Sequence, residues 1–297
     1  MTDASPRSMT RASPATWRSL MFVPATGEKF VAKAHTRGAD VVILDLEDSI
    51  PPGEKAAARA ALPAAAASVG QAGAEVAVRV NRALELAVPD IAAAVMPSVG
   101  TLMLPKVMGP EHIRLLSEVV AAREAAQGMP VGHTRFAAIV ETPDALPLLG
   151  AIAAADPRVV ALGIGAEDLS TELEAVPSGD MLYVYAMMVV AAARAARIQP
   201  LGSVGPFADF SDLPAYRASL KRSRALGFAC QACIHPAQVP IINEEYGPSP
   251  AEVERARRLI AAFDAALAEG KGAVAFEGQM IDLPVVERAR RLLQRAR

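Results

Sequence analysis

Eight short apolar runs, rich in β-branched residues, alternate with longer alanine-rich segments along most of the chain. The expected strands span 19–24, 41–48, 75–81, 101–107, 135–142, 159–168, 200–204 and 232–236. The expected helices span 28–37, 54–67, 89–96, 111–127, 143–154, 183–197, 212–226 and 236–244. Apolar strands that are each followed by a helix are typical of a parallel sheet covered by helices. Eight such units predict a (β/α)8 TIM barrel, and a doubly wound open sheet is the alternative.

The length and the first strand-to-helix turn both favour the barrel. A barrel needs roughly 250 residues, and the chain has 297. No G-x-G-x-x-G motif follows the first strand, which weakens the dinucleotide-binding version of an open sheet. A further helix is expected at 249–269 and a turn followed by a helix at 277–297. We therefore predict a flexible tail at 1–17, a catalytic barrel at 18–247, and a C-terminal helical extension at 248–297 that contacts a neighbouring subunit.

Composition and charge narrow the class of protein. Hydrophobic residues make up 52% and charged residues 21%, which is typical of a globular domain. The net charge of −2 provides no general attraction to nucleic acid or to anionic membranes. Cys230 and Cys233 form one C-x-x-C pair without the second pair of ligands that a structural zinc site needs. We expect a cytoplasmic protein with no nucleic-acid or membrane partner, and buried, reduced cysteines.

Polar residues collect where the expected strands end. They are Asp45, Glu47 and Asp48 after the second strand, Arg79 and Asn81 after the third, Lys106 after the fourth, Glu141 after the fifth, Glu167 and Asp168 after the sixth, and His235 after the eighth. In a barrel these ends converge on one rim, where active sites lie. A lone carboxylate there is more often a helix N-cap, and Asp48 and Asp168 fit that role. So many polar ends on apolar strands nevertheless favour a functional rim.

Two of these carboxylates suit a magnesium ion. Mg²⁺ takes oxygen ligands, keeps several waters and is usually bound by one or two protein carboxylates. Glu141 and Asp168 each follow a strongly apolar strand and are the best candidates for its ligands. Arg79 is a fixed cation that can bind a substrate carboxylate or a developing enolate through two hydrogen bonds. His235, directly before Pro236, fits a structural or hydrogen-bonding role better than a metal ligand.

Nine stretches occur in the order and spacing of a known family. They are RSLMFVP at 18–24, GADVVILDLEDSI at 38–50, VRVN at 78–81, LPKV at 104–107, IVETPDAL at 139–146, GIGAEDLS at 163–170, FADFSD at 207–212, CIHPAQ at 233–238 and GQMIDLPVVERARRLL at 278–293. With these motifs the chain resembles the citrate lyase beta-subunit-like group of the citrate lyase/aldolase superfamily. That group includes malyl-CoA, methylmalyl-CoA and citramalyl-CoA lyases.

The resemblance implies a barrel assembled as a homotrimer or a dimer of trimers, with Mg²⁺ held by Glu141 and Asp168. It implies that Arg79 contacts the oxo-acid portion of the substrate, and that Phe22 and Lys33 contact the CoA moiety. The family delivers a C-terminal Asp from an adjacent subunit, which makes Asp282 the candidate for proton transfer. The sequence alone, without the family resemblance, predicts that Asp282 is the N-cap of the last helix. Glu47 and Asp48, at the end of the second strand, complete the catalytic candidates.

Three positions depart from the family pattern. Gly27 follows Val23-Pro24 later than in many relatives, Val204 stands where many have Asp, and Ala186 stands where many have Arg. These changes leave the acyl substrate open. The predicted function is a Mg²⁺-dependent carbon–carbon lyase acting on a carboxylated 3-hydroxyacyl-CoA such as malyl-CoA, citramalyl-CoA or citryl-CoA. The alternatives are a thioesterase or synthase using the same enolate chemistry, the beta subunit of a citrate lyase acting on a carrier-bound thioester, and a non-catalytic scaffold.

Overall fold

The computed structural model describes residues 15–176, 179–205 and 212–296. The chain divides into two compact units, Met1–Ile242 and Asn243–Arg297. Residues 1–14 of the expected tail and most of the FADFSD motif, residues 207–211, lie outside the described residues. The three-part division expected from the sequence stays a prediction.

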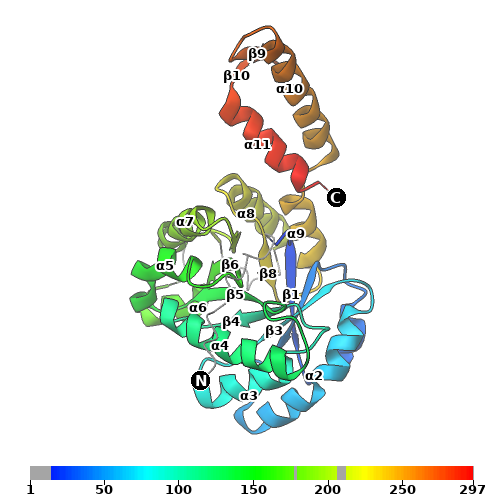
Figure 1. The fold of residues 1–297 in the computed structure, drawn as a ribbon, viewed down its shortest axis with the longest axis vertical. Coiled ribbons are helices and arrows are strands. Elements are labelled where there is room, and N and C mark those ends of the chain that lie inside the picture. The colour runs from blue at the N-terminus through cyan, green and yellow to red at the C-terminus, as the bar shows by residue number, and fades with distance from the viewer. Residues whose placement is uncertain (1–14, 177–178, 206–211, 297) are drawn as a thin grey trace, which may run out of the picture. The chain divides into compact units, whose positions relative to one another are not determined.

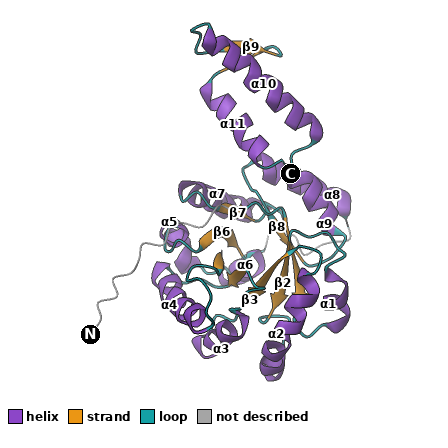
Figure 2. Cartoon of the chain, turned by 45° about the vertical axis from the view of Figure 1, so that its right-hand side comes forward, coloured by secondary structure: helices purple, strands orange, loops and turns teal. Residues whose placement is uncertain are grey.

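The first unit is a parallel eight-stranded barrel. Its strands are β1 Ser19–Pro24, β2 Val41–Asp45, β3 Glu75–Arg79, β4 Thr101–Leu104, β5 Arg135–Val140, β6 Val159–Ile164, β7 Gln199–Leu201 and β8 Gln231–Cys233. They are paired in the order β7-β6-β5-β4-β3-β2-β1-β8. A parallel bridge between Leu201 and Cys230 brings β7 against β8 and closes the ring. Figure 2 shows these strands at the centre of the unit with helices around them. The TIM barrel is thus confirmed and the open sheet was the wrong alternative.

Helices connect the strands around the outside of the barrel (Figure 1). They are α1 Glu28–Ala34, α2 Lys55–Gly70, α3 Leu84–Ala94, α4 Pro110–Ala126, α5 Leu149–Ala153, α6 Ala166–Glu172, α7 Gly179–Ala195, α8 Leu213–Ala225 and α9 Gln238–Tyr246. Short 3-10 turns at Pro52–Glu54 and Pro143–Leu148 precede α2 and α5. Each parallel crossover therefore returns the chain to the same end of the barrel, so all eight strand ends meet at one rim.

Helix α6 corrects the sequence prediction. The strand expected at 159–168 ends at Ile164, and Glu167 and Asp168 lie in the first turn of α6. Acidic side chains are favourable there because the amino end of a helix carries partial positive charge. Asp168 therefore faces the rim from a short helix rather than from a strand tip.

The barrel interior is filled by side chains on alternate strand positions. Leu20, Ile43, Ala77, Met103 and Leu201 belong to one buried cluster inside it. Every residue of β2 is buried, because its second face is covered by helices. Packed interiors of this kind leave space for a ligand only at the rim.

A buried ion pair ties α4 to the starts of β5 and β6. The two Nη atoms of Arg158 donate to the two carboxylate oxygens of Glu124 at 2.8 and 2.7 Å, and Nη1 also donates to the carbonyl of Thr134. The same carboxylate accepts hydrogen bonds from the backbone N–H groups of Gly132 and Thr134. Burial alone raises the pKa of Glu124, but Arg158 and these N–H groups outweigh it and lower that pKa.

The second unit is a helical hairpin with its own small core. It contains α10 Pro250–Ala268, the antiparallel strands β9 Val274–Phe276 and β10 Gln279–Ile281, and α11 Leu283–Gln294. Ser249 begins α10 with a capping box that includes Glu252. Leu259, Phe263, Ile281 and Val286 pack together between the helices. The β-hairpin was not expected, because its strands are only three residues long.

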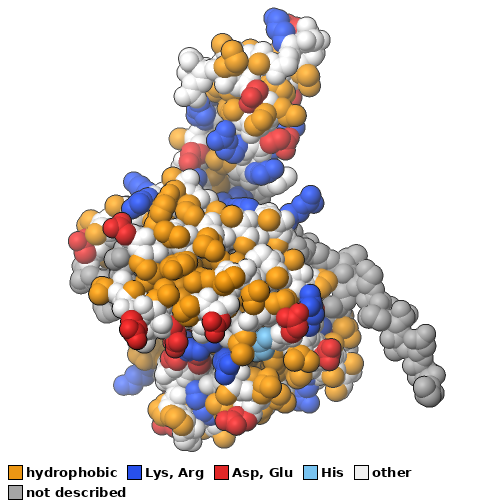
Figure 3. Space-filling view, turned by 90° about the vertical axis from the view of Figure 1, so that its left-hand side faces the viewer, with side chains coloured by type: hydrophobic (Ala, Val, Ile, Leu, Met, Phe, Trp, Pro, Cys, Tyr) orange, Lys and Arg blue, Asp and Glu red, His pale blue; other side chains and the backbone are white. Residues whose placement is uncertain are grey.

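The barrel unit exposes apolar side chains on α7. Tyr183, Val184 and Met188 keep 37%, 56% and 41% of their surface accessible. Helix α7 lies on the side of Figure 1 that faces the viewer in Figure 3, where hydrophobic side chains gather over a broad area. Large apolar patches often mark contact surfaces, but the expected trimer stays a prediction. Within the described ranges, no helix is long and apolar enough to cross a membrane.

Candidate active site

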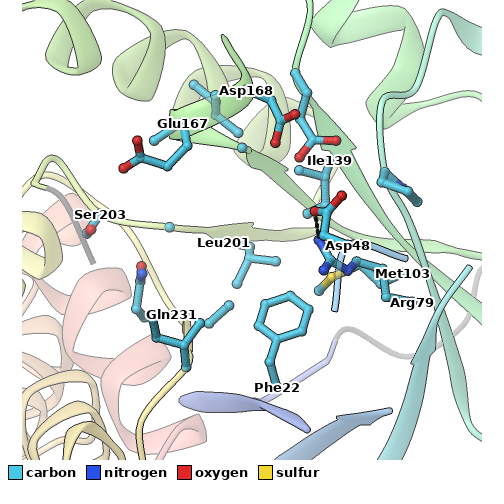
Figure 4. Close-up of a pocket in the computed structure, with 18 of the residues that line it drawn as sticks. Phe22, Asp48, Arg79, Met103, Ile139, Glu167, Asp168, Leu201, Ser203 and Gln231 are labelled. Atoms are coloured by element: carbon cyan, nitrogen blue, oxygen red, sulfur yellow. Dashed lines mark hydrogen bonds and ion pairs between the residues drawn. The ribbon is translucent and has the colours of Figure 1, made fainter. Parts of the chain in front are cut away.

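A cavity of about 570 Å³ opens at the rim where the strands end. This volume falls in the range of roughly 300–1,000 Å³ that is typical of small-molecule sites. Five of the residues selected from the sequence line it: Phe22, Asp48, Arg79, Glu141 and Asp168. Figure 4 shows Arg79 and Asp48 beside each other, with Phe22 below Arg79 and the carboxylate of Asp168 across from them. The rim expected from the strand ends therefore exists.

Arg79, at the end of β3, is held rigidly by the carboxylates that follow β2. Its Nε and Nη2 donate to the two oxygens of Asp45, both at 2.7 Å. Its Nη1 lies 3.0 Å from Oδ2 of Asp48 and 2.9 Å from Oε2 of Glu47. The guanidinium carbon stacks 4.8 Å from the centre of the Phe22 ring. Burial acts to raise the pKa of Asp45, but the hydrogen bonds and charge of Arg79, together with the hydrogen bonds from Ser49 and Glu47, outweigh burial and lower that pKa.

Lys106 links Glu47 to Asp168 across the rim. Its Nζ lies 3.0 Å from Oε1 of Glu47 and 3.2 Å from Oδ1 of Asp168. Its backbone has a positive φ of 48°, which turns the chain sharply after β4. Burial raises the pKa of Glu47, although Arg79 and Lys106 act in the opposite direction. The cluster thus joins residues that follow β2, β3, β4 and β6.

Glu141 is a buried carboxylate beside the Lys106 turn. It is 5% exposed, and its Oε2 accepts a hydrogen bond of 2.5 Å from the backbone N–H of Lys106. Burial, together with the negative charges of Glu47 and Asp168, raises the pKa of Glu141 to about 7. Gly165 lies against this side chain so closely that a Cβ at position 165 would overlap it. The close approach therefore requires glycine.

A buried lysine supports the backbone that carries Glu47. Nζ of Lys55, in α2, donates to the carbonyls of Leu46 and Glu47 at 2.7 Å each, and to Oδ1 of Asn81 at 2.8 Å. Nδ2 of Asn81 donates to the same Leu46 carbonyl and to Asp90. All three hydrogens of the ammonium are used in this way. The Leu46–Glu47 segment is thereby fixed, and with it the direction of the Glu47 carboxylate.

Of the residues implied by the family resemblance, Lys33 does not line the cavity, and Asp282 lies in the other compact unit. Lys33 is an exposed residue of α1. Asp282 belongs to the second unit, where it is exposed and caps α11 by accepting a hydrogen bond from the N–H of Val285. The roles implied for both residues stay predictions.

Four residues of the site were not selected from the sequence. Asp45 and Lys106 were noticed at strand ends but were given no role, and Lys55 and Gly165 were missed. Each acts through a partner far away in the chain, as when Lys55 binds Asn81. The sequence did offer a signal for Asp45, because this charged residue ends a fully buried strand and is followed by further charged residues.

The donor set suits a magnesium ion completed by substrate and water. Glu141 and Asp168 offer carboxylate oxygens to the same cavity, and Mg²⁺ commonly uses one or two protein carboxylates. Among the described residues no group of three or more His, Cys, Asp or Glu side chains is arranged as a metal site. These residues therefore do not form a closed metal site made only of protein ligands. They fit an open site, in which substrate and water complete the coordination of the ion.

Comparison with known proteins agrees with this geometry. The family model for the HpcH/HpaI aldolase/citrate lyase family matches residues 18–236, which contain the whole barrel and every cavity-lining residue. The chain belongs to this family. The citrate lyase/aldolase resemblance inferred from the motifs is thus confirmed.

Named members of the HpcH/HpaI aldolase/citrate lyase family match nearly the whole chain. Citrate lyase subunit beta of Leuconostoc mesenteroides is 33% identical, covering 94% of this chain and 93% of that protein. L-malyl-CoA/beta-methylmalyl-CoA lyase of Cereibacter sphaeroides is 32% identical, covering 94% of each chain. The structure of CitE from Mycobacterium tuberculosis in complex with magnesium, acetoacetate and coenzyme A is 32% identical, with a TM-score of 0.74, covering 95% of this chain and 98% of that one. The family is thus one of lyases, with members that bind magnesium and CoA.

Proposed function

We propose that this protein is a Mg²⁺-dependent lyase that cleaves, or in reverse condenses, a carboxylated 3-hydroxyacyl-CoA. The products of cleavage are an acyl-CoA and an oxo acid. The observation that carries the proposal is the pair of carboxylates, Glu141 and Asp168, lining one cavity with a rigidly held Arg79. The magnesium- and CoA-bound CitE relative supports the choice of metal and substrate class.

The residues of the cavity have different roles in the proposed reaction. Glu141 and Asp168 hold Mg²⁺, which when bound polarises the substrate oxygens as a Lewis acid. A carboxylate base removes the hydroxyl proton, the carbon–carbon bond breaks, and its electron pair passes into a thioester enolate. Arg79 stabilises the negative charge of that enolate, which a proton then converts to the acyl-CoA. Asp45, Glu47 and Asp48 keep the guanidinium in place, so it needs little reorganisation during the reaction.

Asp282 is our candidate for the base. The motif resemblance motivates this choice, and Asp282 caps α11 in the structure. Asp282→Asn retains the capping oxygen, so it should unfold like the wild type but lose at least about tenfold in kcat. Equal turnover by this variant would remove Asp282 from the mechanism.

The proposal is tested by offering malyl-CoA, citramalyl-CoA and citryl-CoA to the purified protein with Mg²⁺ and with EDTA. The expected result is EDTA-sensitive formation of an oxo acid and acetyl-CoA from at least one of them. Free CoA should not form, because its release would indicate the thioesterase or synthase alternative. Cleavage that is unchanged by EDTA and by Glu141→Gln would contradict the proposal.

A second candidate is the beta subunit of a citrate lyase complex. The Leuconostoc relative, a citrate lyase subunit beta, is as similar to this chain as the malyl-CoA lyase is. A subunit of that kind would cleave a carrier-bound thioester and leave free acyl-CoA untouched. The two candidates are separated by comparing the same acyl group on CoA and on a purified acyl carrier protein. Light scattering on the same preparation tests the proposed homotrimer or dimer of trimers.

A further inference from the structure

The two halves of the cavity differ in charge. The half formed by and after β2 to β6 holds the charged residues Asp45, Asp48, Arg79, Glu141, Glu167 and Asp168. The half formed by β7, β8 and α7 is lined by uncharged side chains. Leu182, Ala186, Leu201 and Phe228 form the buried apolar part of that wall, and each is 3% exposed. In Figure 4, Leu201 lies between the two halves, with Ser203 and Gln231 on the side away from Arg79.

The described residues that line the cavity leave no cation free to bind a second anionic group. Among the described residues that line it, Arg79 carries the only positive charge. Its nitrogens are already bound to Asp45 or lie within 3.0 Å of Glu47 and Asp48. Lys106 is shared between Glu47 and Asp168.

We propose that the cavity selects a substrate whose carbinol carbon carries hydrogen or methyl, and discriminates against one that carries a carboxymethyl group. This inference rests on the proposed function, because it names the substituent that the same site accepts. Malyl, citramalyl and citryl thioesters differ only in this substituent. The hydroxyl and the first carboxylate are common to all three and go to the charged half.

The physical reason lies in the uncharged wall. A methyl group there is removed from water by Leu182, Leu201 and Phe228, which improves binding by about fourfold for one carbon. A carboxylate in the same place loses its water without gaining a cation, and unpaired buried charge is strongly unfavourable. Glu167, which also lines the cavity, adds repulsion. The wall therefore distinguishes a methyl group from a carboxymethyl group by charge more than by size.

The experiment compares kcat/KM for the three CoA thioesters with the wild-type protein. The expected value for citryl-CoA is at least ~10-fold below that for citramalyl-CoA, since a lost charge-assisted hydrogen bond has at least this effect. Citryl-CoA cleaved as efficiently as citramalyl-CoA, or more so, would overturn the inference while leaving the lyase function standing.

A matched pair of variants tests the cause. Ala186 is buried in the uncharged wall, and Ala186→Arg places a cation there, whereas Ala186→Met adds an unbranched side chain without charge. The arginine variant should raise the citryl-to-citramalyl ratio of kcat/KM by at least ~10-fold over the methionine variant. Equal ratios in the two variants would contradict a charge-based wall. Circular dichroism confirms that both variants are folded before their ratios are compared.

A binding experiment keeps the inference testable if no thioester is cleaved. Pyruvate and oxaloacetate carry the same methyl and carboxymethyl groups, and calorimetry with Mg²⁺ measures their affinities without turnover. Binding of pyruvate at least ~10-fold tighter than oxaloacetate would support the selective wall even though the lyase function had failed. Tighter binding of oxaloacetate would overturn it.

Discussion

Gly165 offers the sharpest test of how Glu141 is placed. A Cβ at position 165 would lie 2.6 Å from Cδ of Glu141, and nearer still to Cγ and Oε1. Ordinary contact begins at 3.4 Å, so the carboxylate of Glu141 in a Gly165→Ala protein must withdraw by at least 0.8 Å. The backbone itself accepts alanine, because φ and ψ of Gly165 are −85° and 100°. The substitution therefore acts on Glu141 rather than on the local backbone.

The expected result is a loss of catalysis greater than the loss of stability. Misplacement of a catalytic group by about 1 Å costs roughly a hundredfold in rate, so kcat/KM should fall by about that factor. The affinity for Mg²⁺, measured by calorimetry, should fall as well. The substitution should also weaken the hydrogen bond from the Lys106 N–H to Glu141, and this should lower the free energy of unfolding by about 1–3 kcal/mol.

Gly150→Ala is the matched control. Gly150 is exposed in α5, and a Cβ there would meet nothing within 4 Å. The same substitution should leave turnover unchanged and stabilise the helix by about 0.5–1 kcal/mol. If Gly165→Ala kept its Mg²⁺ affinity and its kcat/KM, the placement of Glu141 would not matter for the reaction and the metal assignment would be refuted.

Three further changes test other parts of the molecule. Lys55→Met removes the donor from three buried acceptors and should lower both the free energy of unfolding, by about 2–4 kcal/mol, and kcat. Urea titration measures the first and steady-state kinetics the second. An unchanged kcat would show that Glu47 needs no support from Lys55. Arg79→Lys loses the paired hydrogen bonds to Asp45 and should lower kcat/KM by at least about tenfold; full activity would exclude a role for the guanidinium. Glu124→Gln breaks a buried ion pair and should cost about 3–5 kcal/mol. Because the folded pKa of Glu124 is lowered, its contribution is present above the usual Glu pKa and is lost as pH falls below it, so urea titrations from pH 7 to pH 3 should show a shallower decline in the variant.

The fold was predictable because every strand is apolar and is followed by a helix. The expected starts of β1 to β6 coincide with the observed ones, as at Val41 and Val159. The expected end of β1 is also correct, but those of β2 to β6 run too far, because the polar residues after each of these strands were counted as part of it. The ladder hydrogen bonds stop earlier, and Gly165 then turns the chain into α6. Where pairing stops depends on neighbouring strands, and a single sequence does not contain that information.

The same limit applies to the site. Glu141 and Arg79 could be selected because a charged side chain at the end of a buried strand indicates a structural or functional role. The role of Lys106 could not, because it depends on Glu47, after β2, and Asp168, in α6, both reaching it. The support from Lys55 likewise requires α2 to pack beside Asn81. Position relative to a strand was thus sufficient to select residues that line the cavity, whereas their hydrogen-bond and ion-pair partners required the closed barrel.

The charge of the rim connects the metal to the choice of substrate. Asp45, Glu47, Asp48, Glu141 and Asp168 bring five carboxylates together, and Arg79 and Lys106 bring two cations. An excess of negative charge of this kind favours a bound divalent cation, because the ion stabilises the charged forms of its ligands. It equally disfavours any further anion that does not bind that ion. One substrate carboxylate can be accommodated at the metal, and a second would face either Glu167 or the uncharged wall of Leu182 and Leu201. A site of the proposed kind, acidic enough to hold Mg²⁺ without a third protein ligand, would therefore also select substrates with a single free carboxylate.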